Sequence, residues 1–205
     1  MILLTIEQNI YVVCALIGVL LLTLLIIIFV KRNYLNNKNV DKAVYKKLYR
    51  LAQLNDYLLL NNYKLLISEK SSLTLNHVLI SKKFIILIND FNYSGAISGS
   101  YNDEQLLLHD KNGERLILNP LTYNRNILKR VALLNDLDTS FLKGVVIFAD
   151  DTLFDIKDIP SQYYVCQKKD LASIIKEIDS IDVKPFKDDT VELFIAKLDS
   201  INVKE

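Results

Sequence analysis

The segment FIILINDFNYSG, residues 84–95, decides how the rest of the chain is interpreted. Its first five residues are apolar without interruption, which is typical of a strand that is buried on both faces. An Asn-Asp pair follows, and the segment closes on Asn-Tyr-Ser-Gly, a composition that is common in turns. The stretch therefore predicts a buried strand that leads its polar side chains into a special turn.

Other strands are predicted on both sides of this segment. TLNHVLIS (74–81) and KFIILIND (83–90) form a hairpin through a Ser-Lys turn, and EQLLLHDKNGERLILN (104–119) forms a second one with a type I′ signal at Asn112-Gly113. The remaining predicted strands are YLLLNNYKLLI (57–67), interrupted by a turn at Asn61-Asn62, the wholly apolar GVVIFAD (144–150), and YYVCQ (163–167).

Four amphipathic stretches predict helices in the same region. They cover residues 41–57, residues 120–137 with Pro120 in the first turn, residues 170–181 capped by Asp170, and residues 188–200. This order of elements favours a single α+β (α/β-like) domain over residues 41–205, in which helices pack on a mixed sheet.

The N-terminal stretch IYVVCALIGVLLLTLLIIIFV, residues 10–30, contains no charged residue. At about 1.5 Å per residue such a helix spans roughly 30 Å, the thickness of the hydrocarbon layer. A cleaved signal peptide is the alternative, but Glu7 is the one charge before the stretch and no Ala-x-Ala-like site follows it. We expect residues 1–9 to be a short extracytoplasmic end, residues 10–30 a transmembrane helix, and residues 31–40 a basic juxtamembrane linker.

The flank that follows the predicted span is basic. Residues 31–50 contain seven basic residues and the single acid Asp41, a net charge of +6: Lys31, Arg32, Lys38, Lys42, Lys46, Lys47 and Arg50. The positive-inside rule places this flank in the cytoplasm, which predicts a single-pass protein of the cell membrane with its N-terminus outside. We expect the basic flank to fix the membrane topology and to contact anionic lipid headgroups. A nucleic-acid site is less favoured, since aromatic residues are not interleaved with the basic ones.

Residues in three strand and helix segments resemble a known family. The segments LNHVLIS, INDFNYSGAISGS and NPLTYN follow the order and spacing of the nuclease-related domain (NERD) family, whose signature runs Ile-Asp-His, then Glu-Thr-Lys-Asn-Tyr-x-Gly-x-Ile-x-Gly, then Asn-Pro-x-x-Gln. The preserved residues are His77, Asn92, Tyr93, Gly95, Ile97, Gly99, Asn119 and Pro120. The resemblance covers residues 40–150 and implies a restriction-endonuclease-like core, with His77, Asn92, Tyr93 and Asn119 as binding candidates.

The same resemblance implies that the catalytic positions are degenerate. The family's metal-binding Asp corresponds to Asn76, its Glu to Asn89, its Lys to Phe91 and its Gln to Tyr123. Two amides supply no negative charge for a hard divalent ion, and Phe91 cannot donate a hydrogen bond. Asp90 is adjacent to Asn89, but strand alternation points it to the opposite face. We therefore expect this chain to have no catalytic residue, no metal site and no cofactor.

Two further sets of residues are candidates for a functional site. The triplet Asp155-Ile156-Lys157, with Asp150 and Asp151 nearby, has the acid-x-Lys form but such triplets are frequent in a charged sequence. Among the histidines, His77 suits a structural hydrogen bond, and His109 near a hairpin turn suits a solvated position. Cys14 lies in the predicted span and Cys166 in the soluble part, so the two cannot pair within one chain, and no zinc-site spacing is present.

These observations predict a membrane-anchored, catalytically inactive nuclease-like domain that acts as a binding or scaffold subunit. Its partners are then the membrane and either another protein or further copies of the chain, while nucleic acid is possible but not favoured. An active metal-dependent nuclease with a non-standard site and an unrelated membrane-anchored structural protein remain as alternatives. The abundance of Asn, Lys, Ile and Leu suits an AT-rich bacterial genome.

Overall fold

The computed structural model describes residues 16–28, 40–68 and 71–202. Met1–Asn39 and Val40–Glu205 are separate units, and each is described by itself. In the first unit, residues 16–28 form a helix on which every side chain is exposed. Among the described residues no helix is both long enough and apolar enough to cross a membrane. Residues 10–15 and 29–30 of the predicted span lie outside the described residues, so the transmembrane helix is not confirmed and stays a prediction.

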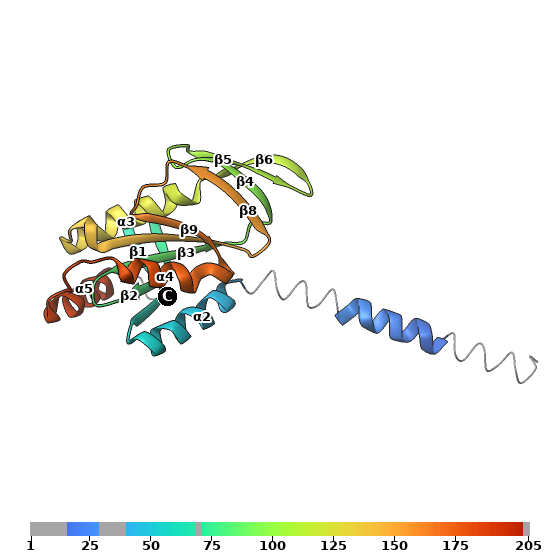
Figure 1. The fold of residues 1–205 in the computed structure, drawn as a ribbon, viewed down its shortest axis with the longest axis horizontal. Helices are drawn as coiled ribbons and strands as arrows, with labels where there is room; N and C mark the ends of the chain where they lie inside the picture. Colours follow the sequence, from blue (N-terminus) through green and yellow to red (C-terminus); the bar gives the residue numbers. More distant parts are fainter. Residues whose placement is uncertain (1–15, 29–39, 69–70, 203–205) are drawn as a thin grey trace, which may run out of the picture. The chain divides into compact units, whose positions relative to one another are not determined.

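The second unit alternates strands and helices, as Figure 1 shows. Its elements are α2 (Val40–Asn55), β1 (Leu58–Ser68), β2 (Ser71–Ile80), β3 (Ile85–Phe91), β4 (Gly95–Ser100), β5 (Gln105–Asp110), β6 (Gly113–Leu118), α3 (Pro120–Asn135), β7 (Leu142–Phe148), β8 (Thr152–Lys157), β9 (Tyr163–Gln167), α4 (Leu171–Ser180) and α5 (Asp188–Ile201), with short 3-10 turns at Thr139–Phe141 and Lys168–Asp170. The unit is of the mixed α+β kind that the sequence predicts.

The predicted buried strand β3 is the middle strand of a five-stranded sheet in the order β1-β2-β3-β7-β9. β1, β2 and β3 pair antiparallel, and Ile80 lies opposite Ile85 where the predicted β2–β3 hairpin closes. β7 runs parallel to both of its neighbours, β3 and β9, which confirms its interior position. Because β3 and β7 are parallel, their polar ends lie at the same edge of the sheet.

A second sheet of four strands, β6-β5-β4-β8, was not predicted from the sequence. Strands β4 and β8 were missed because the sequence GAISGS of β4 contains two glycines and little apolar character. Gly95 has a φ of 121°, and a Cβ atom there would lie 2.3 Å from the carbonyl oxygen of His109 on β5. Glycine is therefore needed for the close approach of β4 and β5, although it hides the strand from sequence reasoning.

Two apolar cores lie on the two faces of the five-stranded sheet. On one face, α2 and α4 cover Ile86 and Ile88 of β3. On the other face, α3, α5 and the inner side of the four-stranded sheet cover Ile85 and Leu87. This alternation explains why β3 reads as an uninterrupted apolar run, since neither of its faces meets solvent.

Three predicted local features are wrong. The turn at Asn61-Asn62 is absent, since β1 is continuous through both residues although Asn62 has a positive φ of 56°. The β5–β6 hairpin forms, but Lys111 and Asn112 make its loop and only Gly113 has a positive φ, whereas a type I′ turn requires two such residues. Asp170 precedes α4, but its side chain makes no capping hydrogen bond.

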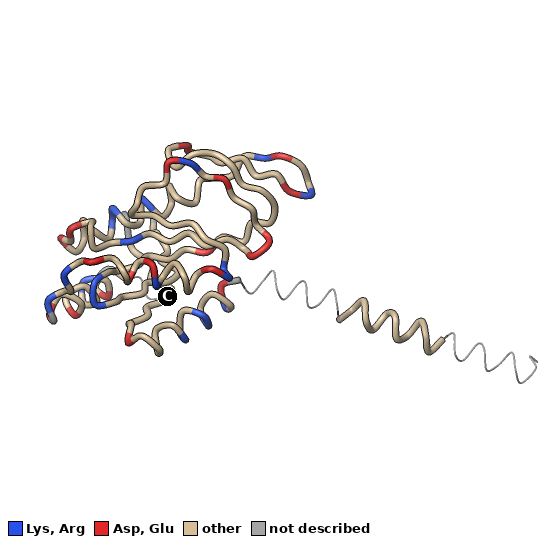
Figure 2. The backbone as a smooth tube through the Cα atoms, in the orientation of Figure 1, with Lys and Arg blue, Asp and Glu red and all other residues tan. Residues whose placement is uncertain are grey.

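Charged residues of the second unit gather on helices and loops, as Figure 2 shows. Lys42, Lys46 and Arg50 are exposed along α2, whereas the ammonium of Lys47 donates to the carbonyl oxygen of Lys168 at 2.9 Å. The other basic residues of the predicted membrane flank, Lys31, Arg32 and Lys38, lie outside the described residues.

Candidate functional site

The polar end of β3 sends two adjacent side chains to opposite faces of the sheet. Asn89 points to the face covered by α3 and is 1% exposed. Asp90 points to the face covered by α2, where 9% of its side chain is accessible. This confirms the alternation expected from the sequence, and it separates the end of the sheet into two different polar environments.

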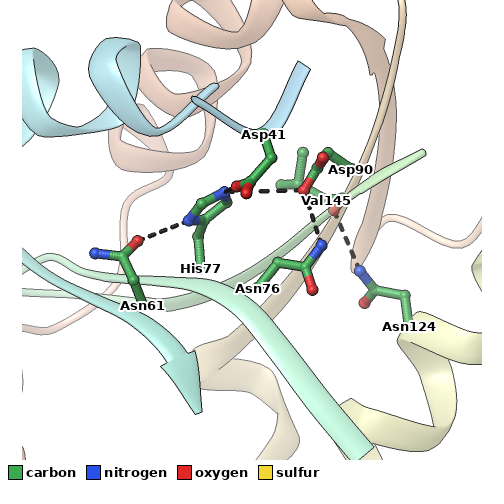
Figure 3. Close-up of polar contacts among 7 residues, drawn as sticks. All are labelled: Asp41, Asn61, Asn76, His77, Asp90, Asn124 and Val145. Carbon is green, nitrogen blue, oxygen red and sulfur yellow. Dashed lines mark hydrogen bonds and ion pairs between the residues drawn. The ribbon is translucent and has the colours of Figure 1, made fainter. Parts of the chain in front are cut away.

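Asp90 belongs to a cluster of three side chains that can each bind a metal ion (Figure 3). The imidazole of His77, on β2, is 2% accessible, and its Nε2 lies 3.5 Å from Asp41 Oδ1 and 3.8 Å from Asp90 Oδ1. Asp41 stands in the first turn of α2, and its side chain is 63% accessible. The three ligand-type atoms all lie within 4.8 Å of one another, and the described residues contain no second group of this kind.

Two asparagines fix the orientation of this cluster. The side chain of Asn61, on β1, lies opposite His77 in the strand register and places its Oδ1 2.6 Å from His77 Nδ1. Asn76 donates from Nδ2 to Asp90 Oδ1 at 2.8 Å. Each of the two inner cluster members is therefore held by an amide that comes from a neighbouring strand, as Figure 3 shows.

The electrostatics of the cluster favour a neutral imidazole. Burial lowers the pKa of His77, and the carboxylates of Asp90 and Asp41 only partly offset this effect. The Nε2 atom is buried and has no hydrogen-bond partner. A cavity of about 390 Å³, lined by Asp41, Lys42, Tyr45, Asn61, Asn62 and His77, opens onto the ring. The cavity therefore borders the ring of His77, whereas Nε2 itself is buried.

Two of the four residues expected at catalytic positions, Phe91 and Tyr123, pack against the apolar core on the α3 face of the sheet. Phe91 and Tyr123 meet edge to face, with ring centroids 6.2 Å apart, and Phe91 also stacks on Tyr93. Neither side-chain polar atom of Asn89 has a hydrogen-bond partner. Asn76 donates from Nδ2 to Asp90 Oδ1 at 2.8 Å.

A family model of the nuclease-related domain (NERD) matches residues 37–149, which is more than half of the 205-residue chain. The chain belongs to the NERD family. No curated protein and no solved structure matched the chain in the other two comparisons. The matched region contains the candidate cluster and all four positions at which the NERD signature carries its catalytic residues.

The NERD positions of this chain do not fit the divalent metal that the family's nuclease core implies. Asn76 and Asn89 stand where carboxylates are expected, and their amides supply no negative charge for the ion. The amide nitrogen of Asn76 faces Asp90, and Asn89 is enclosed by apolar side chains such as Val146, its partner in the register. Hard cations require several oxygen ligands around one point, which these two residues do not provide.

The other binding candidates taken from the NERD resemblance lie apart from the cluster. Asn119 is buried at the start of α3, where its Oδ1 accepts from Leu121 N and its Nδ2 donates to three carbonyl oxygens between β4 and β5. These contacts account for the residue as a helix cap. Tyr93 is half-buried in the aromatic contacts around Phe91, and Asn92 is exposed.

The acid-x-Lys triplet at the end of the chain's second sheet does not form a site with its neighbours. Asp155 and Lys157 are exposed on β8. Asp150 is paired with Lys168 at 3.2 Å, and Asp151 accepts from Ser94 Oγ at 2.7 Å. His109 is exposed beside Glu114, as expected for a solvated hairpin residue.

Sequence reasoning missed the roles of Asp41, Asn61 and Asp90. The signal for Asn61 was present in the strand pattern, because continuing β1 without a turn places Asn61 opposite His77. Asp41 is far from His77 in the sequence, and the distance between them depends on how α2 packs on the sheet. The expectation that the chain has no metal site does not account for this cluster, whose three side chains could hold a metal ion.

Proposed function

We propose that this NERD-family chain is a membrane-anchored protein that does not cut nucleic acid at the family's catalytic positions and that acts as a binding or scaffold subunit. The observation that carries the proposal is the packing around Phe91 and Tyr123, which occupy the positions of the family's Lys and Gln. Metal-assisted cleavage needs carboxylates to hold the ion and a cation to stabilise developing charge, and these positions supply neither.

The aromatic packing also supports a loss of the nucleic-acid cleft. Tyr123 donates from its hydroxyl to the carbonyl oxygen of Thr74 at 3.0 Å, which fixes the ring against Phe91. Phe91 in turn stacks on Tyr93, whose ring contacts Phe148 of β7. Three consecutive ring contacts fill this end of the sheet with aromatic surface, so a phosphate group there meets no cationic group from these side chains.

A surface on the four-stranded sheet supports the binding role. Leu107 of β5 lies opposite Leu116 of β6, and both are exposed on the outer side of the sheet, together with Leu118 and Leu153 of the two edge strands β6 and β8. We refer to these four residues as the leucine face. Exposed apolar side chains that share one face of a sheet are typical of protein contacts, and a second protein or a second copy of this chain is the occupant that we propose.

The membrane role rests on residues 10–30, which carry no charge. We propose that this segment crosses the cell membrane once, with the N-terminus outside and residues 41–205 in the cytoplasm, because the basic residues that follow it favour the cytoplasmic side. A reporter enzyme that folds only in the cytoplasm, fused after Glu205, should be active. Activity that requires an extracytoplasmic reporter instead would contradict this orientation.

The test of the pseudonuclease proposal is a cleavage assay on the purified full chain in detergent, with single- and double-stranded DNA and RNA and either Mg²⁺ or Mn²⁺. We expect no metal-dependent cleavage. The quadruple variant Asn76→Asp, Asn89→Glu, Phe91→Lys and Tyr123→Gln restores the family's residues and should gain metal binding if the frame is intact.

An active nuclease with a non-standard site is the second candidate, and the Asp41–His77–Asp90 cluster is the observation that favours it. If the unchanged chain cleaves nucleic acid and Asp90→Asn abolishes the cleavage, this second candidate is correct. If Asp155→Ala abolishes it instead, the acid-x-Lys triplet is the site. Either result overturns the pseudonuclease proposal.

The scaffold role has a separate test. Leu116→Lys and Leu153→Lys together should weaken self-association in detergent, measured by sedimentation, or release a cross-linked partner from solubilised membranes. Leu133→Lys is the matched control because Leu133 is equally exposed but lies on α3. If the double variant and the control behave alike, the leucine face is not the contact surface.

A further inference from the structure

The Asp41–His77–Asp90 cluster brings three hydrogen-bond acceptors together without a donor between them. Asn61 Oδ1 can only accept, so the short contact of 2.6 Å to His77 Nδ1 requires the proton of the neutral ring to be on Nδ1. The lone pair of Nε2 then points at the carboxylate oxygens of Asp41 and Asp90, 3.5 and 3.8 Å away. A buried nitrogen lone pair that faces two carboxylates is unfavourable unless a cation lies between them.

The separations in this cluster suit one bound ion. A zinc-type ion holds nitrogen and oxygen ligands at roughly 2.0–2.2 Å, and two ligands at a tetrahedral angle are then about 3.4 Å apart. The distances from Nε2 to the two carboxylates are close to this value. The three ligand-type atoms lie within 4.8 Å of one another, and Asp41 is an exposed residue in the first turn of α2 that can adjust its rotamer.

The surrounding residues provide the support that metal ligands usually have. A histidine that binds a metal through one nitrogen commonly donates its other N–H to a carbonyl or carboxylate oxygen, which fixes the tautomer. Asn61 fills this role for His77, and Asn76 holds Asp90 in the same way through its amide nitrogen. The cavity of about 390 Å³ borders Asp41 and His77 and leaves room for water beside the cluster.

We propose that Asp41, His77 and Asp90 form a binding site for a divalent transition-metal ion of the zinc class. One imidazole and two carboxylates favour such an ion over Mg²⁺, which prefers oxygen ligands alone. Two carboxylates balance the charge of the ion, and Lys42, which lines the cavity, is the one basic residue on its rim. The site differs from the metal positions of the NERD signature, which are Asn76 and Asn89 in this chain.

A protonated His77 is the competing explanation, because an imidazolium between two carboxylates also neutralises the cluster. Burial of the ring opposes this state. The two explanations differ in what they require: an ion site must bind one metal per chain, whereas an imidazolium requires protons on both ring nitrogens at neutral pH.

The experiment uses the purified full chain in detergent, first treated with a chelator and then titrated with Zn²⁺ by calorimetry, with Mg²⁺ as the comparison ion. We expect one Zn²⁺ per chain and no saturable binding of Mg²⁺. Substitution of Zn²⁺ by Co²⁺ should give visible absorption bands of a nitrogen- and oxygen-ligated ion. Asn61→Ala should weaken Zn²⁺ binding about 10–100-fold by releasing the ring.

Matched variants show where the ion binds. His77→Gln and Asp90→Asn should abolish the binding, whereas His109→Gln and Asp189→Asn, which change exposed residues elsewhere, should leave it unchanged. Asp41→Asn should weaken binding without unfolding the protein, because Asp41 is exposed, so this variant decides the matter if a buried one fails to fold. The proposal is overturned if no Zn²⁺ binds, if His77→Gln binds Zn²⁺ as the unchanged chain does, if Asp41→Asn leaves the affinity for Zn²⁺ unchanged, or if NMR of the metal-free chain shows both ring nitrogens of His77 protonated at neutral pH.

Discussion

Replacing Asn89 by leucine should stabilise the protein. Asn89 is 1% exposed, and neither its Oδ1 nor its Nδ2 has a hydrogen-bond partner. Its neighbour in the parallel register is the fully buried Val146, so a leucine side chain enters an apolar environment. Asn89 is therefore an amide buried at a cost to folding, at the position where the NERD signature has a catalytic Glu.

The expected gain follows from the unpaired amide. Burying a polar group without hydrogen bonds costs about 1–3 kcal/mol in protein mutational data, and Asn89→Leu removes this cost at similar side-chain volume. For a chain of this size the gain corresponds to a rise in melting temperature of roughly 2–12 °C. Asn89→Asp should act in the opposite direction, because it buries a carboxylate in the same place.

The assay is thermal and urea unfolding of the full chain in detergent, followed by near-ultraviolet circular dichroism of the tyrosines. Asn102→Leu is the control, since Asn102 lies in an exposed turn and its replacement should change the unfolding free energy by less than about 0.5 kcal/mol. A loss of more than about 1 kcal/mol in Asn89→Leu would refute the reasoning, because the amide would then be making contacts that its buried position conceals.

Three further results are expected. Gly144→Ala places a Cβ 2.3 Å from Oδ1 of Asn124, whose Nδ2 donates to the carbonyl oxygens of Leu87 and Val145, so the variant should lose about 2–4 kcal/mol of stability in urea unfolding. The double variant Gly144→Ala with Asn124→Ala should lose clearly less stability than the sum of the two single losses. Burial raises the pKa of Cys166 to about 12, so in a Cys14→Ser background its thiol should stay unreactive toward a disulfide reagent near pH 8 until the protein unfolds, and rapid reaction in the native state would contradict this. Folding lowers the pKa of His77, so the metal-free chain should hold its full stability above the ordinary histidine pKa of 6.5 and lose stability as the pH falls below that value. In unfolding experiments at several pH values, His77→Gln should make this loss of stability smaller.

The main sheet could be predicted from the sequence because its strands bury both faces. Uninterrupted apolar runs identify β3 and β7, and the Ser-Lys loop identifies the hairpin that precedes β3. The four-stranded sheet could not be predicted in full, since glycine and small polar residues in β4 remove the alternation on which strand prediction depends. At Asn62 the sequence predicts a turn that does not form, because the left-handed conformation of this residue is compatible with an unbroken strand.

The candidate site was harder to predict than the fold. Asp90 and His77 are visible in the sequence, and strand alternation gives the correct face for Asp90. The cluster also requires Asp41, whose position depends on the packing of α2 against β2 and β3 through residues such as Val44 and Leu48. Long-range packing of a helix on a sheet leaves no local signal in the sequence, so the three ligands could not be grouped before the structure was known.

Asp41 is also the second residue of α2, at the point where the chain enters the folded unit. Tension applied to the N-terminal segment reaches this first helical turn before any other part of the unit. The first turn of a helix is its weakest end, because its N–H groups lack partners within the helix. A pull on the residues that precede α2 would therefore draw Asp41 away from His77, while the β2–β3 pair keeps His77 and Asp90 in place.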